Sequence, residues 1–461
     1  MRASLFPRGR IALALVFAFA VAVLPTSGHA RREAHPARPN ILLIVTDDQR
    51  SGMLDGMPKT KRLFADAGVT FTDAFATTPL CCPSRASIMT GRYPHNHGVR
   101  RNEDADQLAQ GSTLQYYLQS SGYLTAMAGK YLNGWPEATT SPPYFDKWAA
   151  IDDSDYRRVY RNMTANVNGE VFHPDAYSTG FIEEKSVDFL RSFEGSDAKP
   201  WFLYVAPFAP HAPFVPERRY RDAGTPYFPG NAAVWEADRS DKPPWVRQRN
   251  VRLGGGRALA RRQARTLYSV DDMVDRIFGA LNRMDEARDT LAIFVSDNGY
   301  LWGEHGLASK RFPYTGAVKI PLIIRWPGHV LPDTKDDRIA ANIDLAPTIL
   351  YATGIEPDPD YPIDGRALFG PGSRDRLLIE YFGSKRGKVP SWASIRSAKD
   401  QFVEYYDENG SVIYREYYDL AADPYQLVNL YGDADPFNDP PFAFPATQLA
   451  QSRTCRGSAC P

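Results

Sequence analysis

The part of the sequence that most constrains fold and function is residues 80–91, which read LCCPSRASIMTG. This segment follows an expected strand at residues 69–75, and Pro83 suits the first turn of a helix that Gly91 can end. A cysteine at such a strand-to-helix turn lies at the positive end of the helix dipole, which favours an anion or a reactive nucleophile. Arg85 adds a positive charge one turn later.

The N-terminal segment has the pattern of a secretory signal peptide. Arg2, Arg8 and Arg10 precede an apolar run over residues 11–24, and the small residue Ala30 suits a cleavage site. A transmembrane anchor is the competing interpretation, but the run is short for a bilayer span. We therefore expect cleavage after Ala30 and a secreted protein, extracellular or periplasmic, without a stable membrane anchor.

The four cysteines fall into two pairs with different expected roles. Cys81 and Cys82 are adjacent, and they could be metal ligands, half of a disulfide or small buried side chains as well as a nucleophile. The sequence has no C-x-x-C motif, so a zinc site is not expected. Because an exported chain permits disulfides, Cys455 and Cys460 are predicted to pair near the C-terminus.

Continuous apolar runs alternate with amphipathic segments over most of the chain. The runs typical of strands buried on both faces cover residues 41–45, 201–206 and 291–295. Residues 69–75, 124–128 and 320–325 are also expected to be strands. The other segments predict helices over residues 58–67, 113–120, 181–193, 267–281 and 343–353. This alternation predicts an α/β fold, a mostly parallel sheet with helices on both faces.

The C-terminal part of the chain has a different pattern. Short segments at residues 377–381, 394–396, 401–406 and 412–418 predict an antiparallel sheet, with a hairpin turn at residues 408–410. Residues 215–262 and the proline-rich tail from residue 436 show no clear core element. The expected division is a signal peptide at residues 1–30, a large α/β domain at 38–370, and a smaller α+β domain with its tail at 371–461.

Charge gives no reason to expect a nucleic-acid partner, because the formal net charge of the 461 residues is zero. Residues 252–265 are nevertheless basic, with several arginines around a triple glycine at residues 254–256. These glycines lack the Lys-Ser/Thr of a phosphate-binding loop. We interpret the stretch as a solvated loop, and the alternative is an arginine rim that attracts a polyanionic substrate.

Polar residues directly follow two of the expected central strands. Asp47 and Asp48 follow the first strand, and Asp297 and Asn298 follow a late one. The carboxyl ends of strands are where open α/β sheets place their ligands. Either pair alone could be a helix cap or a solvated turn. Two pairs at equivalent strand ends suit an oxygen-ligated hard cation, calcium or magnesium, rather than zinc.

Three further residues with cationic side chains lie near strand ends. Lys130 follows one expected strand, His211 lies in a proline-rich loop after another, and Lys310 lies between two more. Dense prolines make such a loop rigid. A lone loop histidine is usually solvated, but a position directly after a core strand favours a role in a site.

The segment around Cys81 resembles the signature of the type I sulfatases, Cys-x-Pro-Ser-Arg followed by x-x-x-Met-Thr-Gly. All fixed positions match, namely Cys81, Pro83, Ser84, Arg85, Met89, Thr90 and Gly91. The resemblance implies that a formylglycine-generating enzyme of the host oxidises Cys81 to formylglycine, whose hydrate is the nucleophile. It also implies an alkaline-phosphatase-like fold for the large domain and a sulfated carbohydrate or aryl sulfate as substrate.

The resemblance, which covers residues 38–430, assigns roles to the residues at the strand ends. The metal, calcium or alternatively magnesium, would be held by the formylglycine oxygen at Cys81 and by Asp47, Asp48, Asp297 and Asn298. The sulfate would be surrounded by Arg85, Lys130, His211 and Lys310. His211 is the first candidate, and Lys310 the second, for donating a proton to the leaving alcohol.

Two positions depart from the commonest sulfatase pattern. Many members have Gly-Lys-x-His, whereas this chain has Leu132 in place of the histidine. The form found here is similar to the N-acetylglucosamine-6-sulfatase branch, which makes a glycan 6-O-sulfate the leading substrate. The base for sulfate elimination stays unassigned, with Asn133, His95 and His97 as candidates.

The second departure is Thr315, where the family commonly has glutamate. We expect this change to alter the contacts that support Lys310 and not to abolish activity.

Three other functions share some of these features. An arylsulfatase of broad specificity would use the same chemistry on aryl sulfates. An alkaline-phosphatase-like phosphoesterase or phosphonate hydrolase would be favoured by a second metal set of histidines and aspartates, which the sequence does not show. A secreted glycan-binding protein in which Cys81 is never converted would not need the charged site residues that this chain retains.

Overall fold

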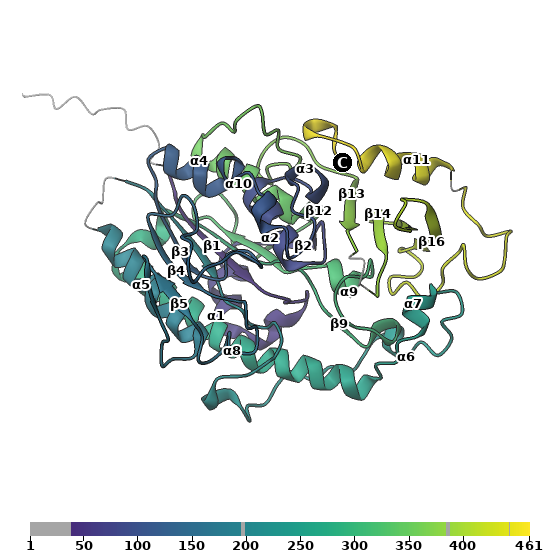
Figure 1. Cartoon of the computed structure of the whole chain (residues 1–461), viewed down its shortest axis with the longest axis horizontal. Coiled ribbons are helices and arrows are strands. Elements are labelled where there is room, and N and C mark those ends of the chain that lie inside the picture. The colour runs from purple at the N-terminus through teal and green to yellow at the C-terminus, as the bar shows by residue number, and fades with distance from the viewer. Residues whose placement is uncertain (1–37, 195–198, 384–387, 442) are drawn as a thin grey trace, which may run out of the picture. The chain divides into compact units, whose positions relative to one another are not determined.

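A mixed, mostly parallel sheet of ten strands organises the computed structural model, which describes residues 38–194, 199–383, 388–441 and 443–461 (Figure 1). The expected signal peptide lies outside these residues. In spatial order the strands are β12 (Thr334–Ala341), β2 (Val69–Phe75), β11 (Leu322–Arg325), β8 (Thr290–Ser296), β1 (Asn40–Thr46), β7 (Trp201–Ala206), β3 (Leu124–Gly129), β4 (Lys147–Ile151), β5 (Ala165–Val167) and β6 (Glu170–Phe172). All six strands expected in the large α/β domain belong to it, which confirms the predicted α/β class.

The strands at the centre of the sheet come from distant parts of the chain. β1 pairs in parallel with β7 on one side and with β8 on the other, and β7 pairs in parallel with β3. In this register Leu43 lies opposite both Tyr204 and Ile293. Since parallel strands end at the same edge, the segments that follow these four strands are brought together there.

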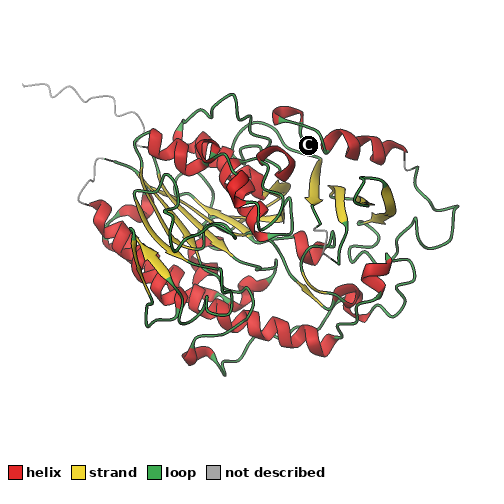
Figure 2. Ribbon diagram, in the orientation of Figure 1, coloured by secondary structure: helices red, strands yellow, loops and turns green. Residues whose placement is uncertain are grey.

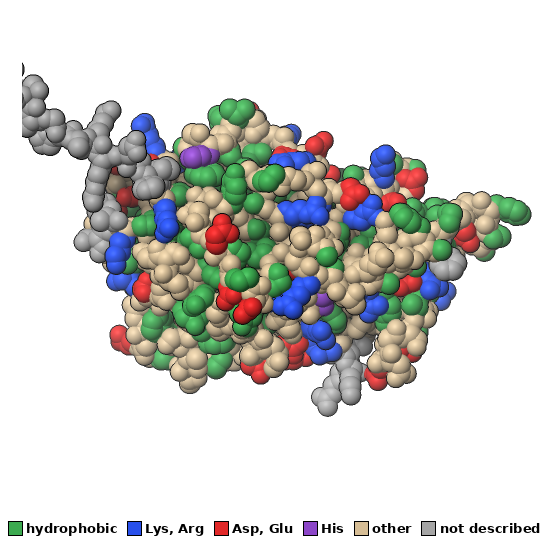
Figure 3. Space-filling model, turned by 90° about the horizontal axis from the view of Figure 1, so that it is seen from above, with side chains coloured by type: hydrophobic (Ala, Val, Ile, Leu, Met, Phe, Trp, Pro, Cys, Tyr) green, Lys and Arg blue, Asp and Glu red, His purple; other side chains and the backbone are tan. Residues whose placement is uncertain are grey.

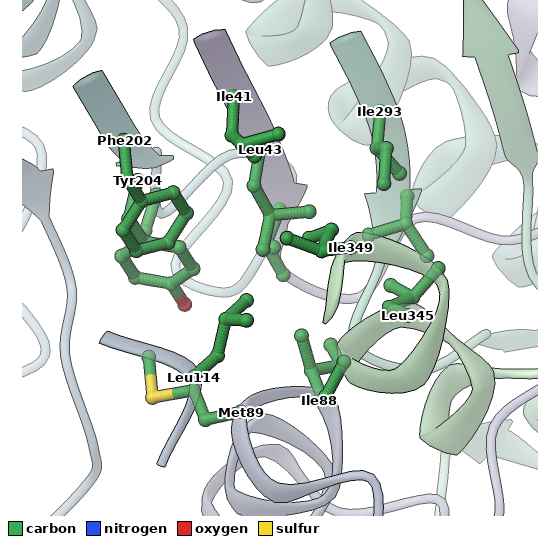
Figure 4. Packing of buried hydrophobic residues seen from close by; sticks show 14 of the residues in the cluster. Ile41, Leu43, Ile88, Met89, Leu114, Phe202, Tyr204, Ile293, Leu345 and Ile349 are labelled. Carbon is green, nitrogen blue, oxygen red and sulfur yellow. The ribbon is translucent and has the colours of Figure 1, made fainter. Parts of the chain in front are cut away.

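Helices cover both faces of the sheet, as predicted (Figure 2). Alternation along β1 separates two cores. Ile41 and Leu43 pack toward α2, α4 and α10 (Figure 4). Leu42 and Ile44 belong to the other core, with residues of α5 and α8. The helices are α1 (Pro58–Thr60), α2 (Cys81–Thr90), α3 (Pro94–His97), α4 (Leu114–Ser120), α5 (Ser178–Glu194), α6 (Ala232–Trp235), α7 (Pro244–Arg247), α8 (Leu253–Arg283), α9 (Thr315–Val318), α10 (Leu345–Thr353) and α11 (Ala443–Ser452). Among the described residues, no helix combines the length and apolarity that a membrane crossing requires.

The predicted antiparallel sheet in the C-terminal part of the chain is confirmed. It consists of β13 (Arg376–Tyr381), β14 (Ser391–Ser397), β15 (Asp400–Tyr406) and β16 (Val412–Asp419), paired in chain order. A two-stranded ribbon, β9 (Leu301–Trp302) with β10 (Ala308–Ser309), precedes it. Cys455 and Cys460 form a disulfide. Residues 38–461 form one compact unit, and the division at residue 371 remains a prediction.

Two segments expected to be irregular contain helices. The tail carries α11, and the basic stretch around the triple glycine forms the first turns of the 31-residue α8. The interpretation of residues 252–265 as a solvated loop is therefore wrong. The physical reason is a close approach: a Cβ at Gly256 would overlap the carbonyl oxygen of Trp302, so glycine is needed there for packing and not for a flexible loop.

Substituting two of these glycines is expected to have opposite effects on stability. Gly256→Ala should lower the free energy of unfolding by about 2 kcal/mol or more, because the backbone of Trp302 must move. Gly254→Ala is the matched control, since its Cβ would meet nothing within 4 Å and alanine favours the helix by up to about 1 kcal/mol. Urea unfolding of both variants measures the difference, and equal effects would contradict the packing explanation.

Candidate active site

Cys81 is the first residue of α2 and lies at the edge where the central strands end. Leu80 before it is extended, and Gly91 ends the helix with a φ of 67°, as the sequence predicts. The Cys81 side chain is buried, and its Sγ lies 2.7 Å from Lys310 Nζ and 3.3 Å from Asp47 Oδ1. Burial, and next the charge of Asp47, raise the pKa of this thiol well above its usual value, so an unmodified Cys81 is a neutral thiol.

The polar residues after β1 and β8 meet beside Cys81. Asp48 has a left-handed backbone with a φ of 70°, and its N–H donates to Asp297 Oδ1 at 3.1 Å. Asn298 Nδ2 donates to Asp48 Oδ1 at 2.7 Å. All four oxygen-bearing residues predicted from the strand ends are buried and adjoin one another, namely Asp47, Asp48, Asp297 and Asn298.

These residues fit a hard divalent cation. Ligand atoms of Asp47, Asp48, Cys81 and His211 lie within 4.8 Å of one another. Asn298 Oδ1 is buried and has no hydrogen-bond partner, which is costly unless a ligand uses it. Burial and the neighbouring Asp47 raise the pKa of Asp297 to about 6, the shift expected where carboxylates are crowded together. Carboxylate and amide oxygens are the ligands that Ca²⁺ and Mg²⁺ prefer.

Three buried cations balance the buried carboxylates. Arg85 Nε donates to Asp297 Oδ2 at 2.9 Å, and Lys130 Nζ donates to Asp47 Oδ2 at 2.6 Å. Lys310 forms an ion pair with Asp48 in addition to its contact with Cys81. Burial alone would raise the pKa of Asp47, but the surrounding cations, Lys130 foremost, hold it well below its usual value. The same three cations can hold a bound anion, because charges in a buried site interact strongly.

The His211 imidazole approaches the carboxylates from the loop after β7. Its Nε2 lies 3.8 Å from Asp48 Oδ2, and its Nδ1 lies 2.6 Å from the carbonyl oxygen of Ala212. A carbonyl oxygen can only accept, so Nδ1 carries a hydrogen, and Nε2 is the nitrogen that can exchange a proton in the site. The loop is fixed by Tyr160, whose hydroxyl donates to the carbonyl oxygen of His211 at 2.6 Å.

The candidate bases named from the sequence occupy different surroundings. Both ring nitrogens of His95 are engaged, by Glu380 and the carbonyl oxygen of Cys455. Burial lowers the pKa of His97 to about 3, and its Nε2 contacts Ser87 Oγ at 3.1 Å. These two histidines therefore have structural partners away from Cys81.

Asn133 and Thr315 also have well-defined partners. Asn133 Nδ2 donates to Asp153 Oδ2 at 2.6 Å, and both residues line the cavity described below. Thr315, the position where sulfatases commonly have glutamate, donates from both its N–H and its hydroxyl to Gln426 Oε1. The contacts of the Lys310 ammonium are instead to Asp48 and Cys81. Thr315 thus anchors the C-terminal segment.

A cavity of ≈ 670 Å³ opens beside Lys130 and His211. Its walls include Asp152 and Asp153, which follow β4, and the half-buried Trp135. Asp153 Oδ2 lies 3.9 Å from Lys130 Nζ. Sequence reasoning missed these residues, since β4 is short and an Asp-Asp pair followed by Ser resembles an ordinary turn. One signal in the sequence does point to Asp152 and Asp153: they form an Asp-Asp pair directly after a strand, as Asp47 and Asp48 do.

The stability of the protein is expected to depend on pH through Glu137, which lies between the cavity-lining residues Pro136 and Ala138. This side chain is fully buried, both of its carboxyl oxygens lack partners, and burial raises its pKa to about 9. The unfolded chain loses the proton near pH 4.5, so stability falls as pH rises between these values. Relative to Glu137→Gln, wild-type stability should fall by up to about 1.4 kcal/mol per pH unit. Urea unfolding at several pH values measures this, and parallel pH profiles would contradict it.

Comparisons with known proteins agree on one family. Residues 39–355 match the family model "Sulfatase", and residues 303–438 match "N-sulphoglucosamine sulphohydrolase, C-terminal". Human N-acetylglucosamine-6-sulfatase is 31% identical over 87% of this chain and 82% of its own length. A Sulf-1 homologue of Caenorhabditis elegans is 32% identical over 79% of this chain, and the chain spans about half of it, 54%.

The solved structures show that the fold is shared. The structure of BT4656 in complex with its substrate D-glucosamine-2-N,6-O-disulfate superposes with a TM-score of 0.77. The match covers 90% of this chain and 96% of BT4656, at 23% sequence identity. At that identity the likeness establishes the architecture around the site and leaves the substrate to be argued from the residues themselves.

Proposed function

We propose that this chain, which belongs to the sulfatase family, hydrolyses the 6-O-sulfate ester of glucosamine-type units in a sulfated glycan. The sulfatase activity follows from the family, and the substrate is inferred from the relative named N-acetylglucosamine-6-sulfatase and from the Leu132 form of the lysine motif. The signal-like N-terminal sequence supports action outside the cytoplasm.

The observation that carries the proposal is the position of Cys81. It begins a helix, it contacts Lys310 and Asp47, and buried cations surround it. A helix N-terminus with nearby ammonium and guanidinium groups is suited to a sulfate ester. Formylglycine at this position, made by a maturation enzyme of the host, would supply a hydrated aldehyde as nucleophile, which a buried neutral thiol does not.

A bound Ca²⁺ or Mg²⁺, held by Asp47, Asp48, Asp297 and Asn298 beside residue 81, would supply Lewis-acid charge stabilisation. The chain's own residues do the rest. Lys130 and Lys310 neutralise sulfate oxygens, and Arg85 keeps Asp297 and Asp47 in place. His211 Nε2 faces the site and donates a proton to the leaving sugar oxygen.

Two features argue against the alternatives. Among the described residues, the other group able to hold a metal is His95 with Cys455 and Cys460, and these cysteines are disulfide-bonded. A phosphoesterase of this fold is expected to hold a second catalytic metal, and the His95 group offers no carboxylate to bind one. Burying charged side chains costs free energy, and a glycan-binding protein with unconverted Cys81 would not need the buried charges around that residue.

The test is mass spectrometry of the tryptic peptide 63–85 from protein secreted by its own host, combined with sulfate release from N-acetylglucosamine 6-sulfate. We expect an aldehyde in place of the Cys81 thiol and sulfate release that depends on it. An intact thiol at Cys81 would favour the glycan-binding alternative. A converted residue without sulfate release would overturn the substrate, and broad p-nitrocatechol sulfate turnover would favour an arylsulfatase.

A further inference from the structure

We propose that the cavity beside Lys130 and His211 binds the sugar ring that carries the scissile sulfate, and that its carboxylates select against a second anionic group on that ring. The preferred ring would carry an amine or acetamide group and a single sulfate. This inference rests on the proposed function, because it assumes that the sulfate occupies the centre at Cys81.

The position of His211 places the sugar in this cavity. The leaving alcohol oxygen belongs to the sugar, and the group that donates a proton to it must lie within hydrogen-bond reach. His211 lines the cavity, and so does Lys130, whose Nζ reaches Asp47 on the inner side. A sulfate at Cys81 therefore has its ester oxygen directed toward His211 and its ring in the cavity.

The charge of the cavity wall is acidic. Glu103, Asp152 and Asp153 line it, and the described lining residues include no arginine and one lysine, Lys130. That lysine is already engaged by Asp47 at 2.6 Å and faces Asp153 at 3.9 Å. A second sulfate or a carboxylate on the same ring would meet these carboxylates, because the two cationic side chains of the wall, Lys130 and His211, face Asp47 and Asp48 at the centre.

The acidic bias is local to the cavity. On the face of the molecule seen in Figure 3, basic and acidic side chains are interspersed, and the whole chain has zero net charge. The wall also carries Trp135 and Tyr156, whose ring faces suit the C–H face of a sugar. Carboxylates next to aromatic rings bind hydroxyl and ammonium groups well and anions poorly.

A second cavity contrasts with this one. It has a volume of ≈ 500 Å³, and its lining includes Lys310 of the centre together with Arg249, Arg311 and Lys388. An anionic neighbouring part of a glycan would therefore be better placed there than beside Asp152. One cavity is acidic and the other is basic, so a charged substrate is favoured in one orientation over the reverse.

The experiment measures binding, so that its failure is distinct from a failure of the proposed activity. The full chain with Cys81→Ala, loaded with Ca²⁺, is titrated calorimetrically with three sugars: glucosamine 6-sulfate, N-acetylglucosamine 6-sulfate and glucosamine 2-N,6-O-disulfate. We expect the disulfate to bind about tenfold more weakly than the other two. The quantity compared is the ratio of the Kd of the disulfate to the Kd of the monosulfated sugars. Adding Asp152→Asn, or Glu103→Gln at another position of the wall, should lower this ratio about threefold.

Asp155→Asn is the matched control. Asp155 is close in sequence to the cavity aspartates, but it is ion-paired with Arg157 and Arg158 and does not line the cavity. The ratio should stay at its starting value in this variant. Equal or tighter binding of the disulfate would overturn the inference, as would a ratio that neither wall variant changes. Failure of all three sugars to bind would show that the cavity is not a sugar site.

Discussion

Replacing Cys81 by alanine is expected to slow sulfate release by roughly 10⁴-fold or more, because alanine cannot be oxidised to the formylglycine that we propose as the nucleophile. Cys81 Sγ is the atom that contacts both Lys310 and Asp47, so the groups that would act on it are already in place. Stability should fall by no more than about 1 kcal/mol, since one buried sulfur atom is removed. The measurement is the initial rate of sulfate release by equal amounts of folded protein, checked by circular dichroism.

The neighbouring cysteine provides the matched control. Cys82 is also buried, but its side chain belongs to the hydrophobic core on one face of the sheet. Its backbone N–H donates to Asn102, a contact that Cys82→Ala retains. This variant should lose about 1 kcal/mol of stability and keep its activity within a few fold. Similar losses in both variants would indicate a packing defect and would contradict a special role for Cys81.

The central sheet and the centre of the site could be predicted from the sequence because both depend on short-range patterns. A buried strand such as residues 41–45 is recognisable as one apolar run, and the parallel arrangement then places the residues after each strand at one edge. Asp47 and Asp297 are 250 positions apart in the numbering, yet they directly follow two strands that pair with each other, β1 and β8. The segment around Cys81 indicated that the site lies at the edge of the sheet where these parallel strands end.

The walls of the substrate cavity could not be predicted in the same way. Asp152 and Asp153 follow β4, which is only five residues long and pairs with the equally inconspicuous β5. Gly256 was misinterpreted for a related reason. Glycine lowers local helix propensity, but the packing of α8 against the ribbon at Trp302 requires it, and that contact is long-range. Local patterns do not contain such tertiary constraints.

Removal of divalent cations is expected to cause the second large loss, a fall in kcat/KM of roughly 10³-fold or more. The buried carboxylates and the unpartnered Asn298 Oδ1 form an oxygen-rich centre that a cation would stabilise. Activity is measured after dialysis against chelator and again after titration with Ca²⁺ or Mg²⁺. At a hundredfold excess over Kd, the bound cation should also add about 2.7 kcal/mol to the free energy of unfolding.

Two variants decide whether that stabilisation arises at the proposed centre. Asp297→Asn removes one carboxylate next to Asp48, so its unfolding should respond weakly to added Ca²⁺. Glu137→Gln removes a buried acid outside the centre and should respond as the wild type does. If both variants gained the same stability from Ca²⁺, the cation would bind elsewhere. Because a site on the surface would be screened by salt while a buried one is not, repeating the titration in 0.5 M NaCl should leave the wild-type response largely unchanged.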